Sequence, residues 1–274
     1  MKPAAFDYVR ADTADAACAL LAQHGEQARI LAGGQSLMAV LNMRLAQPGL
    51  LVDISRSTAL AHIAVHDGQL QVGAAATQAA LEWRDGLARE LPLLQVAFPH
   101  ISHFQIRNRG TVCGSIAHAD PSAELPLCLL ALQGSVVLRS AKRQRVLAAD
   151  AFFTGMLSTA RANDELLEAV RFPLARPGQG FGFCEFSRRH GDFAICAVAA
   201  VADARGLRLA VGGVADRPQA RDWPLLDGSA LDDALNEFAW ALDARDDGHM
   251  SAAARRHLVR RLGHQAIEQA RNSL

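Results

Sequence analysis

The sequence has no paired cysteines, no excess of charge and no long apolar run. Its five cysteines form no CxxC pair, and their spacing suits neither zinc nor an iron–sulfur cluster, so the chain is expected to hold neither. Its 28 basic residues balance 28 acidic ones, which leaves no global field to recruit nucleic acid or an anionic membrane. No apolar stretch approaches the length of a membrane span. These absences argue against a zinc or iron–sulfur site in this chain, a nucleic-acid partner and a membrane span.

Three other signals are missing. The first residues lack a basic segment followed by an apolar core, so cytoplasmic residence is expected. The GxGxxG fingerprint of a dinucleotide-binding βαβ unit is absent, which argues against a Rossmann fold. No aromatic residues interleave with the basic clusters at 139–145 and 255–256. These clusters therefore predict solvated strand or helix faces.

With 274 residues, 50% of them hydrophobic, the chain is long enough for a sizeable core and for more than one domain. Residues 173–180 contain two prolines and two glycines and form the best candidate boundary. We therefore expect an α+β domain at 1–175, with subdomains at about 1–57 and 58–175, and a small α/β domain at 176–274.

Hydrophobic patterns, caps and turn residues predict the order of the elements. Asp67 and Gly68 form a hairpin signal, and Thr77 is placed to cap a helix. Helices are expected at 14–24, 77–84, 91–104, 122–132, 151–157, 231–242 and 250–271, with another between the first two strands. Strands are expected at 29–31, 50–54, 62–66, 69–73, 135–138, 145–147, 165–172, 181–186, 195–202 and 207–211.

Two glycine-bearing turns about eighty residues apart are the most informative feature. Each ends in a small hydroxyl residue before an apolar stretch, so each can present backbone N–H groups to an anion. One such turn suggests a phosphate, and two suggest a diphosphate held between them. In the first turn Ser36 is a candidate N-cap. The first turn consists of Ala32, Gly33, Gly34, Gln35 and Ser36, and the second of Thr111, Val112, Cys113, Gly114 and Ser115.

Each turn also has a purely structural interpretation. A Gly-Gly turn between a strand and a helix more often serves backbone geometry than a ligand. The polar residues on both sides of the second turn can form a long loop, closed by Asp120 and Pro121 before a helix near Glu124. That interpretation explains the proline and the acid, but not the clustering of glycine, serine, threonine and histidine.

Several motifs together resemble the FAD-binding medium subunit of molybdenum hydroxylases. This group includes the carbon monoxide dehydrogenase medium subunit and the flavin domain of xanthine dehydrogenase. The resemblance covers essentially the whole chain, and its motifs follow one another in the right order at compatible spacing. They lie at residues 32–37, 44–48, 51–54, 106–114, 118–121 and 188–194.

The resemblance implies a two-subdomain FAD-binding domain of the vanillyl-alcohol oxidase / p-cresol methylhydroxylase type. A small α/β C-terminal domain with a three-stranded sheet and helices should follow. FAD would lie extended and noncovalently bound between the subdomains, with its diphosphate on the two turns. Molybdopterin and [2Fe-2S] clusters would belong to partner subunits only.

Individual site residues carry over from the resemblance. It places the diphosphate and ribityl contacts on residues 32–36 and 111–115. Ile101 would be an apolar residue at the flavin, Glu124 matches the acidic position, and Leu166 or Leu167 would offer a backbone contact near the ring. Phe193 would cover one face of the isoalloxazine, unless it is an ordinary core phenylalanine.

Two positions depart from the family pattern. Cys113 stands where a second glycine is common, so either its backbone angles are ordinary or the turn carries strain of about 1–3 kcal/mol. Glu185 stands where some relatives carry lysine, and a carboxylate close to reduced anionic flavin would oppose its charge. His118 and His190 are expected to be structural or flavin-adjacent groups rather than general bases.

The resemblance implies an electron-relay oxidoreductase subunit without a catalytic side chain. It would work with an iron–sulfur small subunit and a molybdopterin-binding large subunit, in a dimer of heterotrimers. FAD would collect electrons from [2Fe-2S] clusters and pass them to an external acceptor. The alternatives are a stand-alone flavoprotein reductase of the same fold and a flavin-less scaffold in which Cys113 marks a degenerate site.

Overall fold

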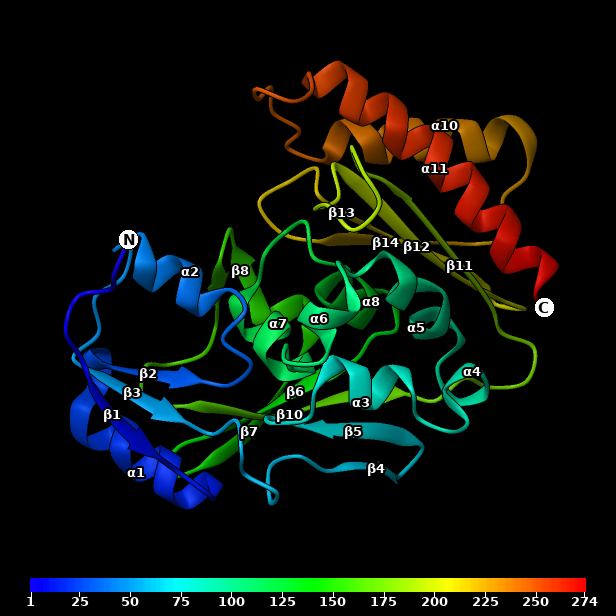
Figure 1. Cartoon of the computed structure of the whole chain (residues 1–274). Coiled ribbons are helices and arrows are strands. Elements are labelled where there is room, and N and C mark those ends of the chain that lie inside the picture. The colour runs from blue at the N-terminus through cyan, green and yellow to red at the C-terminus, as the bar shows by residue number, and fades with distance from the viewer.

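A computed structural model describes residues 1–274, and its first unit is a small parallel sheet in the order β1-β3-β2. Helix α1 packs on this sheet (Figure 1). The predicted βαβ unit is therefore confirmed, and its first glycine turn lies between β2 and α2. The elements are β1 (Asp7–Arg10), α1 (Ala14–His24), the 3-10 turn η1 (Gly25–Gln27), β2 (Ala28–Leu31), α2 (Leu37–Asn42) and β3 (Leu50–Asp53).

The second unit is a five-stranded antiparallel sheet in the order β4-β5-β10-β6-β7. Asp67 and Gly68, both with positive φ, form the predicted hairpin turn between β4 and β5. The strands are β4 (Ile63–His66), β5 (Gln69–Gly73), β6 (Ser135–Arg139), β7 (Gln144–Ala148) and β10 (Leu166–Pro173).

Short helices cover one face of this sheet and separate it from the C-terminal sheet (Figure 1). Their apolar side chains join strand side chains in a core cluster of 47 buried residues. The helices are α3 (Gln78–Glu82), α4 (Leu87–Glu90), α5 (Pro92–Ala97), η2 (Phe98–His100), α6 (Phe104–Arg107), α7 (Val112–His118) and α8 (Glu124–Ala131).

Two of the predicted helices are wrong in extent. The expected helix at 91–104 breaks into α5, η2 and α6, because Pro99 has no N–H to continue the ladder and Ser102 adopts φ +43°. The expected helix at 151–157 is only α9 (Ala149–Phe152). The chain then pairs as the short strands β8 (Phe153–Gly155) and β9 (Ser158–Thr159).

The C-terminal sheet runs β11-β12-β13-β14, so it has four strands where three were expected. The unforeseen strand, β14, is an edge strand with exposed charged residues and lacks the apolar alternation that signals a strand. The other strands and both helices occur as predicted. The elements are β11 (Gly180–Phe186), β12 (Cys196–Asp203), β13 (Gly206–Gly212), β14 (Gln219–Trp223), α10 (Gly228–Ala241) and α11 (Ala252–Asn272).

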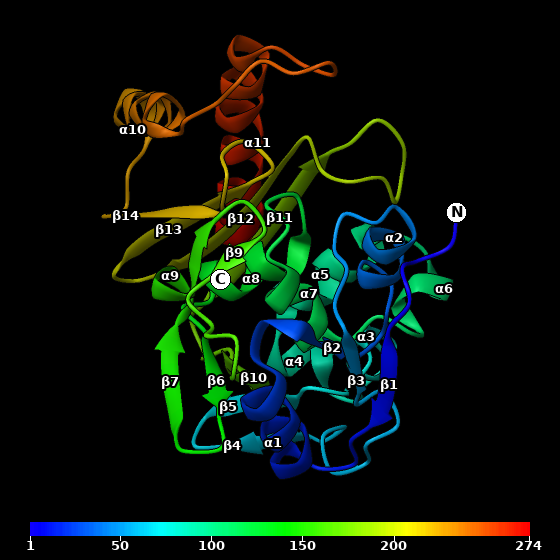
Figure 2. The same ribbon diagram turned by 90° about the vertical axis from the view of Figure 1, so that its left-hand side faces the viewer.

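Helices α10 and α11 lie on the face of this sheet that points away from the rest of the chain (Figure 2). Helix α11 approaches β11 very closely: a Cβ on Gly182 would lie 1.9 Å from the carbonyl oxygen of Ala266. This packing encloses a second core cluster of 19 buried residues. No helix of the structure combines the length and apolarity needed to cross a membrane.

Candidate flavin site

A cavity of about 1190 Å³ lies among the connections of the three larger sheets. The first glycine turn, the start of α7 and the start of β10 line it from the N-terminal part of the chain. The β11–β12 loop and residues 213–216 and 243–247 contribute from the C-terminal part. Segments far apart in the sequence thus form one long site.

The first turn exposes unpaired backbone donors. Gly34 has φ +73°, a conformation that favours glycine. The backbone N–H groups of Gly33, Gly34, Gln35 and Ser36 donate to no other group of the chain. Ser36 occupies the predicted N-cap position of α2, but its side chain makes no capping hydrogen bond, and its φ of −91° and ψ of −46° are already helical. The turn is suited to binding an anion through its backbone.

The second turn is the beginning of a helix. Thr111 is the N-cap of α7, and its Oγ1 accepts a hydrogen bond of 2.9 Å from the backbone N–H of Gly114. Gly114 leaves room for this bond, since a Cβ there would lie 2.6 Å from Thr111 Oγ1. The glycine therefore serves the helix cap, and the backbone of this segment lines the cavity.

Cys113 has an ordinary helical backbone within α7 and is not among the residues with positive φ. The strained alternative for this position is therefore excluded. Its side chain is buried, and Sγ donates to the carbonyl oxygen of Val72 at 3.3 Å. Burial raises the pKa of this thiol well above its usual range. The cysteine is an unreactive packing residue at the cavity wall.

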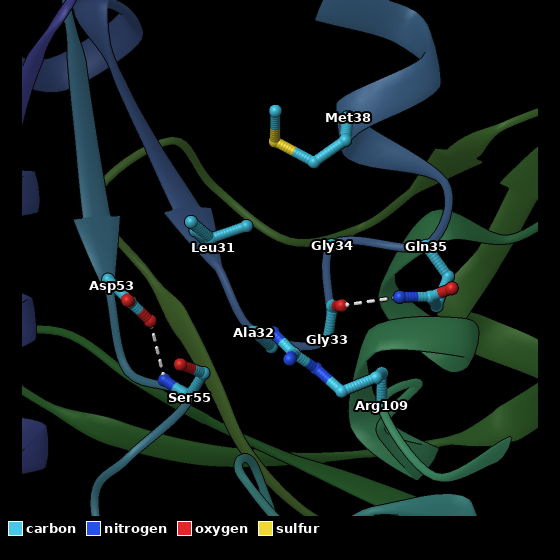
Figure 3. A pocket seen from close by; sticks show the side chains of 9 residues that line it. All are labelled: Leu31, Ala32, Gly33, Gly34, Gln35, Met38, Asp53, Ser55 and Arg109. Atoms are coloured by element: carbon cyan, nitrogen blue, oxygen red, sulfur yellow. Dashed lines mark hydrogen bonds between the residues drawn. The ribbon is translucent and has the colours of Figure 1, made fainter. Parts of the chain in front are cut away.

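A smaller cavity of about 380 Å³ lies beside the first turn (Figure 3). The Arg109 side chain reaches across the turn there and forms no ion pair or hydrogen bond within the chain. Asp53 accepts hydrogen bonds from Tyr8 Oη at 2.5 Å and from the N–H of Ser55 at 2.7 Å. Burial opposes ionisation of Asp53, but these hydrogen bonds outweigh it and lower its pKa.

Two acidic side chains in this part of the structure have raised pKa values. Glu124, the first residue of α8, is only 7% exposed and lines the large cavity. Burial is the main cause that raises its pKa to about 7; a backbone hydrogen bond and Arg107 oppose the shift, and Asp120 adds to it. Glu185 on β11 has a buried Oε2 atom without a hydrogen-bond partner. Burial and the charge of Glu124 raise its pKa to about 8.

The structure brings most of the predicted site residues to one cavity. Val112 is completely buried in the core, and neither Val112 nor Glu185 is among the lining residues. The separation of Glu185 from the lining argues against its direct contact with a flavin. The predicted residues that line the cavity are Ala32, Gly33, Gly34, Gln35, Ser36, Ile101, Thr111, Cys113, Gly114, Ser115, Glu124, Leu166, Leu167 and Phe193.

Phe193 is not a core residue, because 72% of its surface is exposed. It belongs to the β11–β12 loop, in which Gly191 has φ +83° and packs against His103. An exposed aromatic ring at a cavity mouth is available to cover a planar ligand. His118 also lines the cavity, whereas the His190 ring lies 6.2 Å from that of His100.

Several polar lining residues were not predicted as site residues, and Gln78 is one of them. Gln78, the first residue of α3, is buried at the cavity wall. The only local signal was its place directly after the Thr77 cap, and this does not show that the side chain meets a segment thirty residues downstream.

The groups that line the cavity fit FAD. Unpaired backbone N–H groups next to glycines suit a diphosphate, and the adjoining apolar wall of Ile101, Leu166 and Leu167 suits a flavin ring. A family model described as the FAD binding domain in molybdopterin dehydrogenase matches residues 4–175. The chain belongs to this family.

Medium subunits of this family are similar to the chain over almost its whole length. It is 38% identical to the alpha subunit of the 6-hydroxypseudooxynicotine dehydrogenase complex of Paenarthrobacter nicotinovorans, covering 98% of this chain and 96% of the relative. It is 33% identical to the carbon monoxide dehydrogenase medium chain of Afipia carboxidovorans, covering 99% and 98% respectively. The chain is thus an FAD-binding medium subunit of the molybdenum hydroxylase type.

Solved structures agree with this membership. Reconstituted carbon monoxide dehydrogenase from Oligotropha carboxidovorans superposes with a TM-score of 0.94 at 31% identity, covering 100% of both chains. Quinoline 2-oxidoreductase from Pseudomonas putida 86 gives a TM-score of 0.90 at 31% identity, covering 100% of this chain and 99% of the other. The predicted fold class is confirmed, with a fourth strand in the C-terminal sheet.

Proposed function

We propose that this medium subunit holds FAD noncovalently and relays electrons from the [2Fe-2S] clusters of a partner subunit to an external acceptor. The observation that carries the proposal is the row of unpaired N–H groups in the first turn, directly beside the start of α7. FAD supplies the relay because it exchanges electrons singly or in pairs.

The residues of the chain would bind and orient the cofactor. The backbone of residues 33–36 would hold the diphosphate, with Thr111, Gly114 and Ser115 nearby on α7. Ile101, Leu166 and Leu167 would exclude water from the ring, and exposed Phe193 would cover it. No side chain needs to act as a nucleophile or general base.

Substrate oxidation would take place in a molybdopterin-binding large subunit, with an iron–sulfur small subunit between the two. Relatives named as medium chains or subunits of dehydrogenase complexes support this assignment. We propose a dimer of heterotrimers in the cytoplasm. Residues 1–175 would form the flavin domain, with subdomains at about 1–57 and 58–175, and residues 176–274 the C-terminal domain.

The relay is tested with the purified chain and its partner subunits. The chain alone should show a flavin spectrum and release all its flavin on acid treatment, and substrate should leave it oxidised. With both partners present, substrate should bleach the flavin. Bleaching of the isolated chain by an organic substrate would favour the stand-alone reductase, and absence of flavin would favour the scaffold.

A further inference from the structure

Arg255, near the beginning of α11, is a buried cation at the C-terminal wall of the cavity. Its Nη1 donates to the carbonyl oxygens of Ile195 at 2.9 Å and Gly213 at 2.6 Å. Its Nη2 forms an ion pair with Asp247. One guanidinium group therefore joins three segments that are distant in the chain, and all three line the cavity.

The contact with Ile195 is at the end of the β11–β12 loop. The Ile195 N–H donates to the carbonyl oxygen of Phe186 at 2.9 Å, so both backbone groups of Ile195 are paired at the base of the loop. Within residues 187–194 the only backbone hydrogen bond runs from Asp192 N–H to Arg189 at 3.1 Å. Phe193, two residues before Ile195, is 72% exposed and has little packing of its own. Its position therefore depends on how the base of the loop is held.

The other partners of Arg255 are themselves held in place. Asp247 Oδ1 accepts hydrogen bonds from the N–H groups of His249 at 2.8 Å and Met250 at 2.9 Å. The Gly213 N–H donates to the carbonyl oxygen of Pro121 at 2.7 Å. Because both partners are fixed, the guanidinium group is a rigid anchor for Ile195.

We propose that Arg255 is a positioning residue that holds Phe193 in place to cover the flavin, acting through the Ile195 carbonyl; this inference rests on the proposed function. A guanidinium group is planar and carries five donors in fixed directions, so it can bond three acceptors at once. The anchor orders the base of the loop before the cofactor arrives. FAD binding then has less ordering of the loop to offset.

A double-mutant cycle of Arg255→Met and Phe193→Ala tests this assignment. Arg255→Met alone should weaken FAD binding by about 5- to 50-fold in a fluorescence titration of the apo chain. Phe193→Ala should also weaken binding, because the cover of the ring is lost. With Phe193→Ala already present, Arg255→Met should weaken binding by less than about threefold, because the side chain that it positions is gone.

The melting temperature of the apo chain measures the structural part of the effect. Arg255→Met should lower it equally with Phe193 or with alanine at position 193, because Asp247 and two carbonyl groups lose their partner in both cases. Arg261→Met, at an exposed position of the same helix outside the cavity lining, is the matched control. It should change neither the affinity nor the melting temperature.

The cycle separates positioning from a purely structural role. An equal fold-loss of FAD affinity with and without Phe193 would overturn the inference, as would unchanged affinity in folded Arg255→Met. If Arg255→Met does not fold, Arg255→Lys replaces it in the cycle, because lysine keeps the positive charge but lacks the planar fork. FAD binding by the unaltered chain checks the proposed function separately, and its absence would overturn both.

Discussion

The backbones of Gly33 and Gly110 lie in direct contact. A Cβ on Gly33 would lie 2.6 Å from Gly110 Cα and 2.2 Å from the carbonyl oxygen of Arg109. No side chain fits there without movement of backbone. This contact joins the first glycine turn to the segment that leads into α7, so both flank one cavity. It gives Gly33 a role in close packing, distinct from the positive φ of Gly34.

Gly33→Ala should separate the two segments. The added methyl group meets backbone atoms, so we expect a loss of about 1–3 kcal/mol in the free energy of unfolding and a marked loss of FAD affinity. Gly248→Ala is the control, because nothing lies within 4 Å of its added Cβ, and it should change stability by less than about 0.5 kcal/mol. Denaturant titration and flavin content measure the two effects. Full FAD affinity in the Gly33 variant would contradict the tight contact.

Gly34→Val should weaken FAD binding at least about tenfold, because valine disfavours φ +73° and narrows the approach to the turn. Gly178→Val is a matched control. Gly178 has φ +75° but open space around it, so the variant suffers the same backbone strain outside the cavity lining. Both variants should lose stability, and only the first should lose flavin. Equal FAD affinity in the two folded variants would argue against a diphosphate at this turn.

Cys113→Gly should destabilise the chain by about 1–3 kcal/mol, because it places glycine inside α7 and removes a buried side chain. It should not tighten FAD binding, since Cys113 is not strained. Cys113→Ala separates the lost packing from the flexibility of glycine and should cost less. Urea unfolding of the unaltered chain and the two variants measures the order of their stabilities. Tighter FAD binding by the glycine variant would show that the cysteine restricts the site.

The buried carboxyls predict a pH-dependent stability. Their folded pKa values of about 7 and about 8 lie above the ordinary glutamate value of 4.5, so from about pH 4.5 to about pH 8 the folded state binds more protons than the unfolded state. This contribution to stability is present in full below about pH 4.5, and it is lost as the pH rises to about 8.

Glu124→Gln should therefore reduce the loss of unfolding free energy with rising pH, and it should stabilise the chain by about 1–3 kcal/mol at pH 8. Unfolding free energies measured from pH 5 to pH 9 test this expectation. Glu268→Gln, at an exposed position on α11, should leave the wild-type profile unchanged. An unaltered pH profile in Glu124→Gln would mean that this carboxyl ionises normally in the folded chain.

The order of elements was largely predictable from the sequence because its signals are local. Thr13, Thr77, Thr111 and Ser251 all cap helices, and caps depend on residues only three positions apart. The strands of both antiparallel sheets follow from apolar runs and turn residues. The edge strand β14 was missed because its stability comes from pairing with β13 rather than from its own composition.

The sequence by itself determined the two glycine-bearing turns and, through its motifs, the family. Only the tertiary structure decided that Gly33 packs on Gly110, that Cys113 is helical, and that Phe193 is exposed. It also decided which polar groups are paired: Gln78 and Glu185 each have a buried oxygen without a hydrogen-bond partner, which the sequence did not indicate. Burial and pairing depend on contacts between segments distant in the chain, and local patterns carry no record of those contacts.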